Sequence, residues 1–310
     1  MFTLTLYTMM GLLLILVIGF FLSKNDVIND EVSEKFTYIL TNIIVPCNVF
    51  MALQVDVSAV STKNMLIALL MDTVFFVSVI IISLVICRLL KMPDEKDGVI
   101  VCTLAFGNVS FIAFPLLANI IGEDTSFYVA LGQIPFNVLF FTIGIYLISK
   151  DSNKEKFSLK SLLTPNLIAI FAGLVCFFLQ IQLHKAISVG VELLAKMSAP
   201  ISLFILGKFL SDMNIEEAFE DKEVYIITAI KLFLIPYIFL SIFKDISDDN
   251  LLLASSLTLY AMPTVTLVPI FAKRYGADYE LASKVVFLTT VVSLLSTPMF
   301  VYLMEYTINF

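Results

Sequence analysis

The stretch LAFGNVSFIAFPLLANIIGED, residues 104–124, is mostly apolar but is interrupted by glycine, asparagine and proline. The stretch LYAMPTVTLVPIFAKRYGAD, residues 259–278, has the same character and contains Pro263 and Pro269. Proline removes a backbone donor and clashes with the preceding helical turn, so both stretches are expected to be broken helices. Backbone groups freed at membrane depth must be satisfied by protein, water or ligand. We therefore expect two unwound segments that cross near the middle of a membrane.

The two stretches belong to an internal repeat. At an offset of 154 residues, FPLLANIIGED (114–124) aligns without a gap with VPIFAKRYGAD (268–278), and Pro46 aligns with Pro200. This offset relates the second apolar segment to the seventh and the fourth to the ninth, so each repeat has five spans. Because five is odd, the second copy must enter the membrane from the opposite side. Inverted repeats that meet at broken helices are typical of secondary transporters.

The composition requires a membrane. Of 310 residues, 59% are hydrophobic and 15% are charged, against about 45–50% and about 25% in soluble domains. We predict an all-α membrane protein with repeats at 1–149 and 161–310, joined by a short cytoplasmic loop at 150–160. The segments expected to span a bilayer are 5–22, 36–54, 65–90, 98–119, 127–149, 164–183, 187–209, 223–243, 251–272 and 281–304. Residues 1–22 contain no Lys or Arg, so we expect a first span there rather than a leader.

The loop charges predict an orientation. Thirteen Lys and Arg residues lie in or beside the odd-numbered loops, and only Lys63, Lys185 and Lys244 lie in the even-numbered ones. Positive loops stay in the cytoplasm, so we expect a multi-pass protein of the plasma membrane with both termini outside.

The two breaks supply the candidate binding residues. Asn108, beside Gly107, can donate to a carboxylate, although it can equally form a hydrogen bond between helices. Half-helix N-termini at the breaks would attract an anion. The other substrate-binding candidates at the breaks are Pro115, Pro263, Thr264, Thr266 and Pro269. Two further amides, Asn48 near Pro46 and Asn137 in the fifth span, can line the site or bond between helices.

Two charged residues fall inside predicted spans, where charge is costly and usually functional. Lys231 lies about 13 Å deep, by helical rise, and can pair with a substrate carboxylate or with an acidic side chain. Asp72 can carry a coupling proton or simply pair with Lys231. The repeat matches neither charge, since Asp72 aligns with Ile226 and Lys231 with Val77.

The sequence lacks the motifs of several classes of enzyme and metal site. The sequence contains no HExxH, GxSxG, P-loop or paired-carboxylate constellation, and its one histidine is in a predicted external loop. The four cysteines have no CxxC spacing, and no basic domain suggests nucleic acid. We therefore expect no enzyme, no catalytic residue, no metal site and no cofactor.

These motifs resemble the auxin efflux carrier family, which includes plant PIN-type carriers and bacterial malonate-type permeases. The similarity covers nearly the whole chain, and its segments are GNVSFIAFPLLANIIGED, MPTVTLVPIFAKRYGAD, MSAPISLFILGKFL (197–210) and FNVLFFTIG (136–144). The resemblance implies a fold shared with bile-acid transporters and sodium/proton antiporters. It implies a scaffold of spans 1, 2, 6 and 7, and a transport domain of spans 3–5 and 8–10. Unlike the plant carriers, this chain has a short central loop, so their regulatory sites do not carry over.

The resemblance further implies elevator-type transport of a small organic anion, a dicarboxylate such as malonate or malate or an auxin-like carboxylate. Membrane lipid is the expected surroundings, and related carriers suggest a homodimer through the scaffold. Coupling to H⁺, coupling to Na⁺ and potential-driven uniport all stay open. The alternatives are a cation/proton antiporter or sodium symporter on the same fold, a channel, and a non-transporting membrane sensor.

Overall fold

The computed structural model describes residues 2–54, 61–89, 92–150, 164–212 and 221–308, and every named element in these ranges is helical. Within these ranges seven helices are long and apolar enough to cross a membrane, and they are Phe2–Lys24, Asp30–Ala52, Thr62–Leu89, Thr125–Ser149, Lys185–Asp212, Lys222–Phe243 and Tyr279–Ile308. Two shorter apolar helices are Pro165–Leu179 and Asn250–Tyr260. The prediction of a helical membrane protein is therefore confirmed.

The described part of the first half contains four uninterrupted stretches of helix and one that breaks. Its elements are α1 (Phe2–Lys24), α2 (Asp30–Ile39), η1 (Leu40–Ile44), α3 (Val45–Ala52), α4 (Thr62–Leu89), α5 (Asp94–Ala105), η3 (Val109–Ala113), α6 (Phe114–Ile120), α7 (Thr125–Leu139), η4 (Phe140–Gly144) and α8 (Ile145–Ser149). The helical path from α2 to α3 is continuous, and so is the path from α7 to α8. Only the stretch from α5 to α6 is interrupted, at residues 106–108.

The second half follows a similar order. Its elements are α9 (Pro165–Leu179), α10 (Lys185–Lys196), α11 (Ser198–Asp212), α13 (Lys222–Ala229), η6 (Ile230–Leu234), α14 (Ile235–Phe243), α15 (Asn250–Tyr260), α16 (Leu267–Tyr275) and α17 (Tyr279–Ile308). Each segment expected to span the bilayer is thus largely helical, with ends shifted by a few residues. The sixth is the one most shortened, because α9 ends where Gln180 turns left-handed with φ 53°.

Wide π-helical turns, which the sequence analysis did not anticipate, come directly before three prolines. The N–H of Val45 bonds to the carbonyl of Leu40, five residues back, immediately before Pro46. The same spacing occurs at Phe114 before Pro115, and at Ile235 before Pro236. A proline lacks its own N–H and its ring crowds the preceding turn, so a widened turn lets the helix continue.

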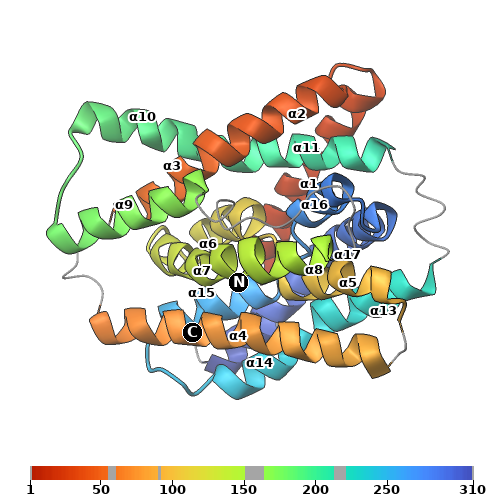
Figure 1. Ribbon diagram of the computed structural model, residues 1–310. Coiled ribbons are helices and arrows are strands. Elements are labelled where there is room, and N and C mark those ends of the chain that lie inside the picture. The colour runs from red at the N-terminus through yellow and green to blue at the C-terminus, as the bar shows by residue number, and fades with distance from the viewer. Residues whose placement is uncertain (1, 55–60, 90–91, 151–163, 213–220, 309–310) are drawn as a thin grey trace.

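The helices form two outer sides around a middle layer. α2, α10 and α11 lie along one side and α4 and α14 along the other, with α6 and α7 between them (Figure 1). On the first side α1 packs closely on α11, because glycines face backbone on both helices. A Cβ on Gly19 would lie 2.7 Å from the Cα of Phe204, and one on Gly207 would lie 2.5 Å from the backbone nitrogen of Phe20.

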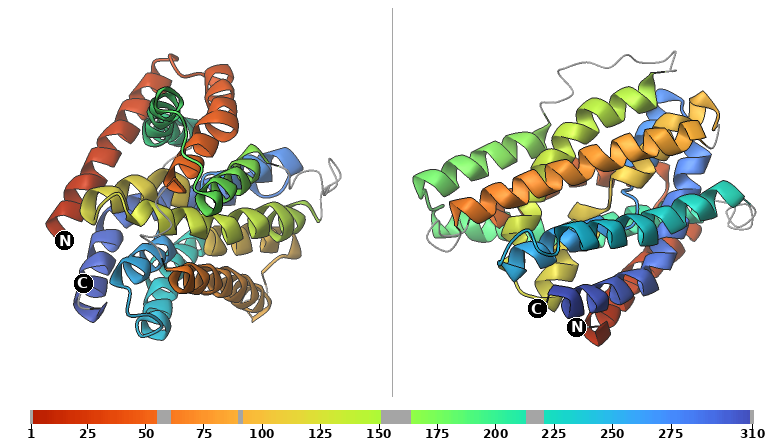
Figure 2. Two further views of the ribbon diagram at one scale, coloured as in Figure 1. Left: turned by 90° about the vertical axis from the view of Figure 1, so that its left-hand side faces the viewer. Right: turned by 90° about the horizontal axis from the view of Figure 1, so that it is seen from below.

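The start of α1 and the end of α17 lie close together in both views of Figure 2. The rings of Phe2 and Tyr302 meet edge to face with centroids 6.4 Å apart. Large apolar side chains such as Leu14, Phe171 and Leu295 are more than half exposed on the outer helix faces. Exposed large apolar side chains of this kind on many helices fit contact with lipid rather than water.

Candidate functional site

The two interrupted helices hydrogen-bond to each other through their unwound segments. α5 ends at Ala105 and α15 ends at Tyr260, and the chain becomes helical again at Val109 and Leu267. Between these ends the two segments form an antiparallel bridge at Gly107 and Thr264. The N–H of Asn108 donates to the carbonyl of Pro263 at 2.7 Å, and the N–H of Val265 donates to Phe106 at 3.1 Å. We call residues 106–108 and 261–266 together the paired break.

The side chain of Thr264 completes the pairing. Its hydroxyl donates to the carbonyl of Thr103 at 2.8 Å, near the end of α5. Its backbone N–H donates to the hydroxyl of Thr289 on α17 at 3.2 Å. Gly107 allows the close approach, because a Cβ there would lie 3.1 Å from the Cβ of Met262. Thr264 and Gly107 therefore hold the two segments together.

The side chain of Asn108, unlike that of Thr264, makes no described bond across the break. It is 1% exposed and precedes the helical run 109–120, yet its side chain makes no capping hydrogen bond. Its Oδ1 has no hydrogen-bond partner among the protein groups that the structure describes. Asparagine is a preferred N-cap, so a buried one that does not cap the helix is unusual. The Oδ1 of Asn108 is therefore available to a ligand as a hydrogen-bond acceptor.

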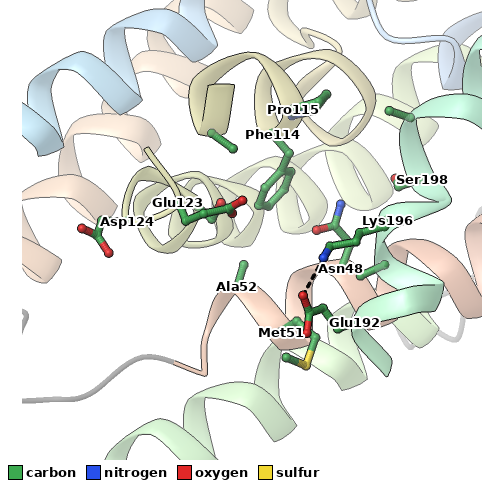
Figure 3. A pocket seen from close by; sticks show the side chains of 14 residues that line it. Asn48, Met51, Ala52, Phe114, Pro115, Glu123, Asp124, Glu192, Lys196 and Ser198 are labelled. Carbon is green, nitrogen blue, oxygen red and sulfur yellow. Dashed lines mark hydrogen bonds and ion pairs between the residues drawn. The ribbon is translucent and has the colours of Figure 1, made fainter. Parts of the chain in front are cut away.

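A pocket of about 510 Å³ opens between α3, α6, α7, α10 and α11, and none of the residues of the paired break lines it. Asn48 and Pro115 line it, together with Phe114 and Ser198 (Figure 3). Its charged residues are Glu123, Asp124, Glu192 and Lys196. Lys196 pairs with Glu192 at 2.7 Å, so the pocket carries more negative than positive charge.

The structure distributes the predicted binding residues over several places. Gly107, Asn108, Pro263 and Thr264 meet at the paired break, whereas Asn48 and Pro115 line the pocket. Thr266 precedes α16 and is buried, and Pro269 is buried in the first turn of that helix. Asn137, Lys231 and Asp72 lie outside the pocket lining and have partners of their own.

Asn137 belongs to a chain of polar side chains that runs from η3 to α9. Its Nδ2 donates to the Oε1 of Gln133 at 3.2 Å, and its Oδ1 accepts from Asn166 at 2.9 Å. Gln133 donates in turn to the hydroxyl of Ser110 at 2.7 Å. The sequence analysis missed Ser110, Gln133 and Asn166. The four-residue spacing of Gln133 and Asn137, which puts both amides on one helix face, was the available signal.

Lys231 is fully buried in the π turn η6, which packs against α5 and α17. Its Nζ donates to the carbonyl of Leu104 at 2.9 Å, one residue before α5 ends. The predicted lysine therefore contacts the broken helix through its backbone.

Asp72 is also fully buried, and its Oδ1 accepts from the hydroxyl of Tyr260 at 2.7 Å. Its Oδ2 has no hydrogen-bond partner among the described groups. Asp72 and Lys231, both in the described part of the chain, do not form an ion pair. The pairing that the sequence left open as one role of Asp72 is absent.

Comparison with known proteins adds independent evidence. The family model described as "Membrane transport protein" matches residues 4–301. The chain is 25% identical over 210 residues to a protein of Rhizobium meliloti (strain 1021) named "Putative malonate transporter", a match that covers 65% of each chain. It is 23% identical over 302 residues to an "Uncharacterized transporter" of Methanocaldococcus jannaschii, covering 91% of this chain and 93% of the relative. A similar transporter of Methanothermobacter thermautotrophicus is 20% identical over 295 residues, covering 94% of this chain and 96% of the relative.

Proposed function

The chain belongs to the membrane transport protein family, the auxin efflux carrier family that its motifs resemble, and from this we propose that it carries a small organic anion across the plasma membrane. A dicarboxylate such as malonate or malate, or an auxin-like carboxylate, is the proposed substrate. The relative named as a malonate transporter supports the dicarboxylate.

One observation carries the proposal. The side chain of Asn108 is buried at the start of a helical run, does not cap it, and has an Oδ1 without a described hydrogen-bond partner. In the proposal the Nδ2 of Asn108 donates to a substrate carboxylate, the Oδ1 accepts from a donor on the substrate or from water, and the N–H groups at the start of that run share the negative charge. Lys231 adds attraction at longer range. Asn48 and Pro115 on the pocket wall hold the rest of the substrate.

The proposed mechanism is elevator-type alternating access over ten spans arranged as two inverted repeats. Spans 1, 2, 6 and 7 form the scaffold and carry α1, α3, α9 and α11, and the paired break travels with the other spans. The position of the pocket, with α3, α10 and α11 on one wall and α6 and α7 on the other, supports a site between the two parts. We propose in addition that both termini lie outside and that two chains associate through the scaffold.

Coupling to protons through Asp72 is part of this proposal, because its Oδ2 is a buried carboxylate oxygen without a described partner. Proton coupling predicts that uptake follows an imposed pH gradient and that Asp72→Asn abolishes this dependence. Potential-driven uniport predicts that uptake follows voltage alone, where one charge across 100 mV is worth about 2.3 kcal/mol.

A binding experiment tests the substrate class. Purified protein is heated with malonate, malate, indole-3-acetate or chloride, in parallel with the variants Asn108→Leu and Asn119→Leu. Asn119 lies in the same broken span but is exposed, so it is the matched control. A ligand that binds only the folded state at a hundredfold excess over Kd stabilises it by about 2.7 kcal/mol. A carboxylate should stabilise the wild type and Asn119→Leu but not Asn108→Leu. An equal shift in Asn108→Leu rejects the proposed site.

The acidic pocket favours a second candidate, a cation/proton antiporter on the same fold. Glu123 and Asp124 line the pocket, and its one lysine is already paired with Glu192. An antiporter predicts that no carboxylate shifts the melting temperature and that a pH gradient drives cation flux into vesicles. Loss of that flux in Glu123→Gln and Asp124→Asn would favour this function over anion transport.

A further inference from the structure

The carbonyl groups at the end of α5 need partners, because a helix leaves its last four carbonyls without an intrahelical donor. Three of these groups have partners that the structure describes. The carbonyl of Cys102 accepts from the N–H of Phe106 at 3.1 Å, and that of Thr103 accepts from the hydroxyl of Thr264 at 2.8 Å. The carbonyl of Leu104 accepts from the Nζ of Lys231 at 2.9 Å. Two of these three carbonyls, those of Thr103 and Leu104, are therefore satisfied by side chains from the second half of the protein.

The Lys231 contact differs from the others because it brings a charge. The end of an α-helix carries a partial negative charge of about half an electron, and a cation beside it is stabilised. A buried lysine normally pairs with a carboxylate, but Asp72 is not within ion-pair distance and no acidic partner of Lys231 occurs among the described ion pairs. The helix end is thus the described group that offsets the burial of this ammonium.

The second break is closed differently. At the end of α15 the N–H of Ala261 bonds to the carbonyl of Thr258, and that of Met262 bonds to Leu259. This tight turn satisfies two of the last carbonyls of α15 with N–H groups of the same segment. The position that Lys231 occupies aligns in the other repeat with Val77, which carries no charge. Only one of the two breaks thus contains a lysine at its carbonyl end.

Backbone carbonyls of unwound segments and of half-helix C-terminal ends, such as the end of α5, coordinate Na⁺ in transporters with broken helices. Here one such carbonyl is already bound to a side-chain nitrogen. We infer that Lys231 is a built-in cation at the carbonyl end of α5, and that the paired break is therefore complete without a bound metal ion such as Na⁺. The inference concerns the break itself and does not depend on which substrate the protein carries.

A comparison of cations tests this inference on the whole purified protein. The melting temperature is measured at constant ionic strength in NaCl, KCl and choline chloride, and choline is too large to enter a carbonyl site. The wild type should melt at the same temperature in all three salts. A wild-type melting temperature that is higher in Na⁺ than in choline would show that the folded protein binds Na⁺, and it would overturn the inference.

The variant Lys231→Gln separates charge from hydrogen bonding, because glutamine keeps a donor but has no charge. Lys244→Gln is the matched control, since Lys244 is exposed at the end of the same helix path. We expect Lys231→Gln to melt several degrees below both the wild type and the control, and to recover part of that loss in Na⁺ but not in choline. If it melts like the control, or does not respond to Na⁺, the lysine is not acting as a cation. If the variant does not fold, the wild-type salt comparison still decides.

Discussion

The hydroxyl of Tyr260 donates a hydrogen bond of 2.7 Å to the Oδ1 of Asp72, and both residues are fully buried. Tyr260 is the last residue of α15, so this bond ties α4 directly to the start of the second break. The ring of Tyr260 also stacks on Phe75 with centroids 3.7 Å apart. The carboxyl group of Asp72 on α4 is thereby held by α15, the helix that leads into the paired break.

The variant Tyr260→Phe should therefore be destabilised by about 1–3 kcal/mol, because it leaves a buried carboxyl group without its described hydroxyl partner. The aromatic stack on Phe75 is kept, so the loss reports the hydroxyl alone. Thermal unfolding in detergent measures the effect. Tyr302→Phe, at an exposed position on α17, is the control and should change stability little. Equal stability of the two variants would show that the Asp72 contact contributes nothing.

The variant Thr264→Val keeps the side-chain volume nearly constant but removes the buried hydroxyl that donates to the carbonyl of Thr103. It should therefore lose about 1–3 kcal/mol of stability. Thr307→Val is matched to it, because that hydroxyl also donates to a backbone carbonyl but is exposed. Chemical or thermal unfolding of both variants makes the comparison. A Thr264→Val protein as stable as Thr307→Val would contradict the role assigned to the paired break.

The variant Gly107→Ala should be destabilised by about 1–3 kcal/mol, because its new methyl group would lie 3.1 Å from the Cβ of Met262 and 3.3 Å from the carbonyl oxygen of Leu259. Both contacts are tighter than ordinary van der Waals distances, so the two segments must separate. Gly11→Ala, in a helix with open space around the glycine, should instead be neutral or slightly stabilising. Melting temperatures of the pair check this prediction, and a neutral Gly107→Ala would refute it.

The variant Asn137→Leu should cost more stability than Asn166→Leu. Asn137 bonds to the backbone and side chain of Gln133 and accepts from Asn166, so its loss strands several buried polar groups. Asn166 has one described bond, and its Oδ1 already lacks a partner. The expected difference is about 1 kcal/mol or more in unfolding free energy. A larger loss in Asn166→Leu would reverse the order assigned to these two amides.

Much of the helical layout could be predicted because apolar length and proline are local signals. The effect of proline on a helix located the second break, because Pro263 lies in the unwound segment 261–266. At Pro115 the expectation was wrong, since the helix continues there through a π turn and the break lies at Gly107 and Asn108. The sequence named Thr264 only as a candidate binding residue. It could not show that the hydroxyl of Thr264 donates to the carbonyl of Thr103, because the two residues are remote in sequence. Side-chain partners depend on helix rotation and packing, which a hydrophobic pattern does not specify. This is why Gln133 and Asn166 were missed, and why the sequence left open a pair between Asp72 and Lys231.

The bond from Asn108 to Pro263 has a consequence for how the protein is made. A ribosome delivers Asn108 to the membrane long before Pro263 exists. Until then the amide of Asn108 and the carbonyl of Phe106 lack the backbone partners that they have in the finished protein. Unpaired backbone groups are costly in lipid, so the nascent first half must keep this stretch near water or held by other groups until the second half inserts. The backbone hydrogen bonds of the first break are thus completed only when synthesis of the chain has nearly ended.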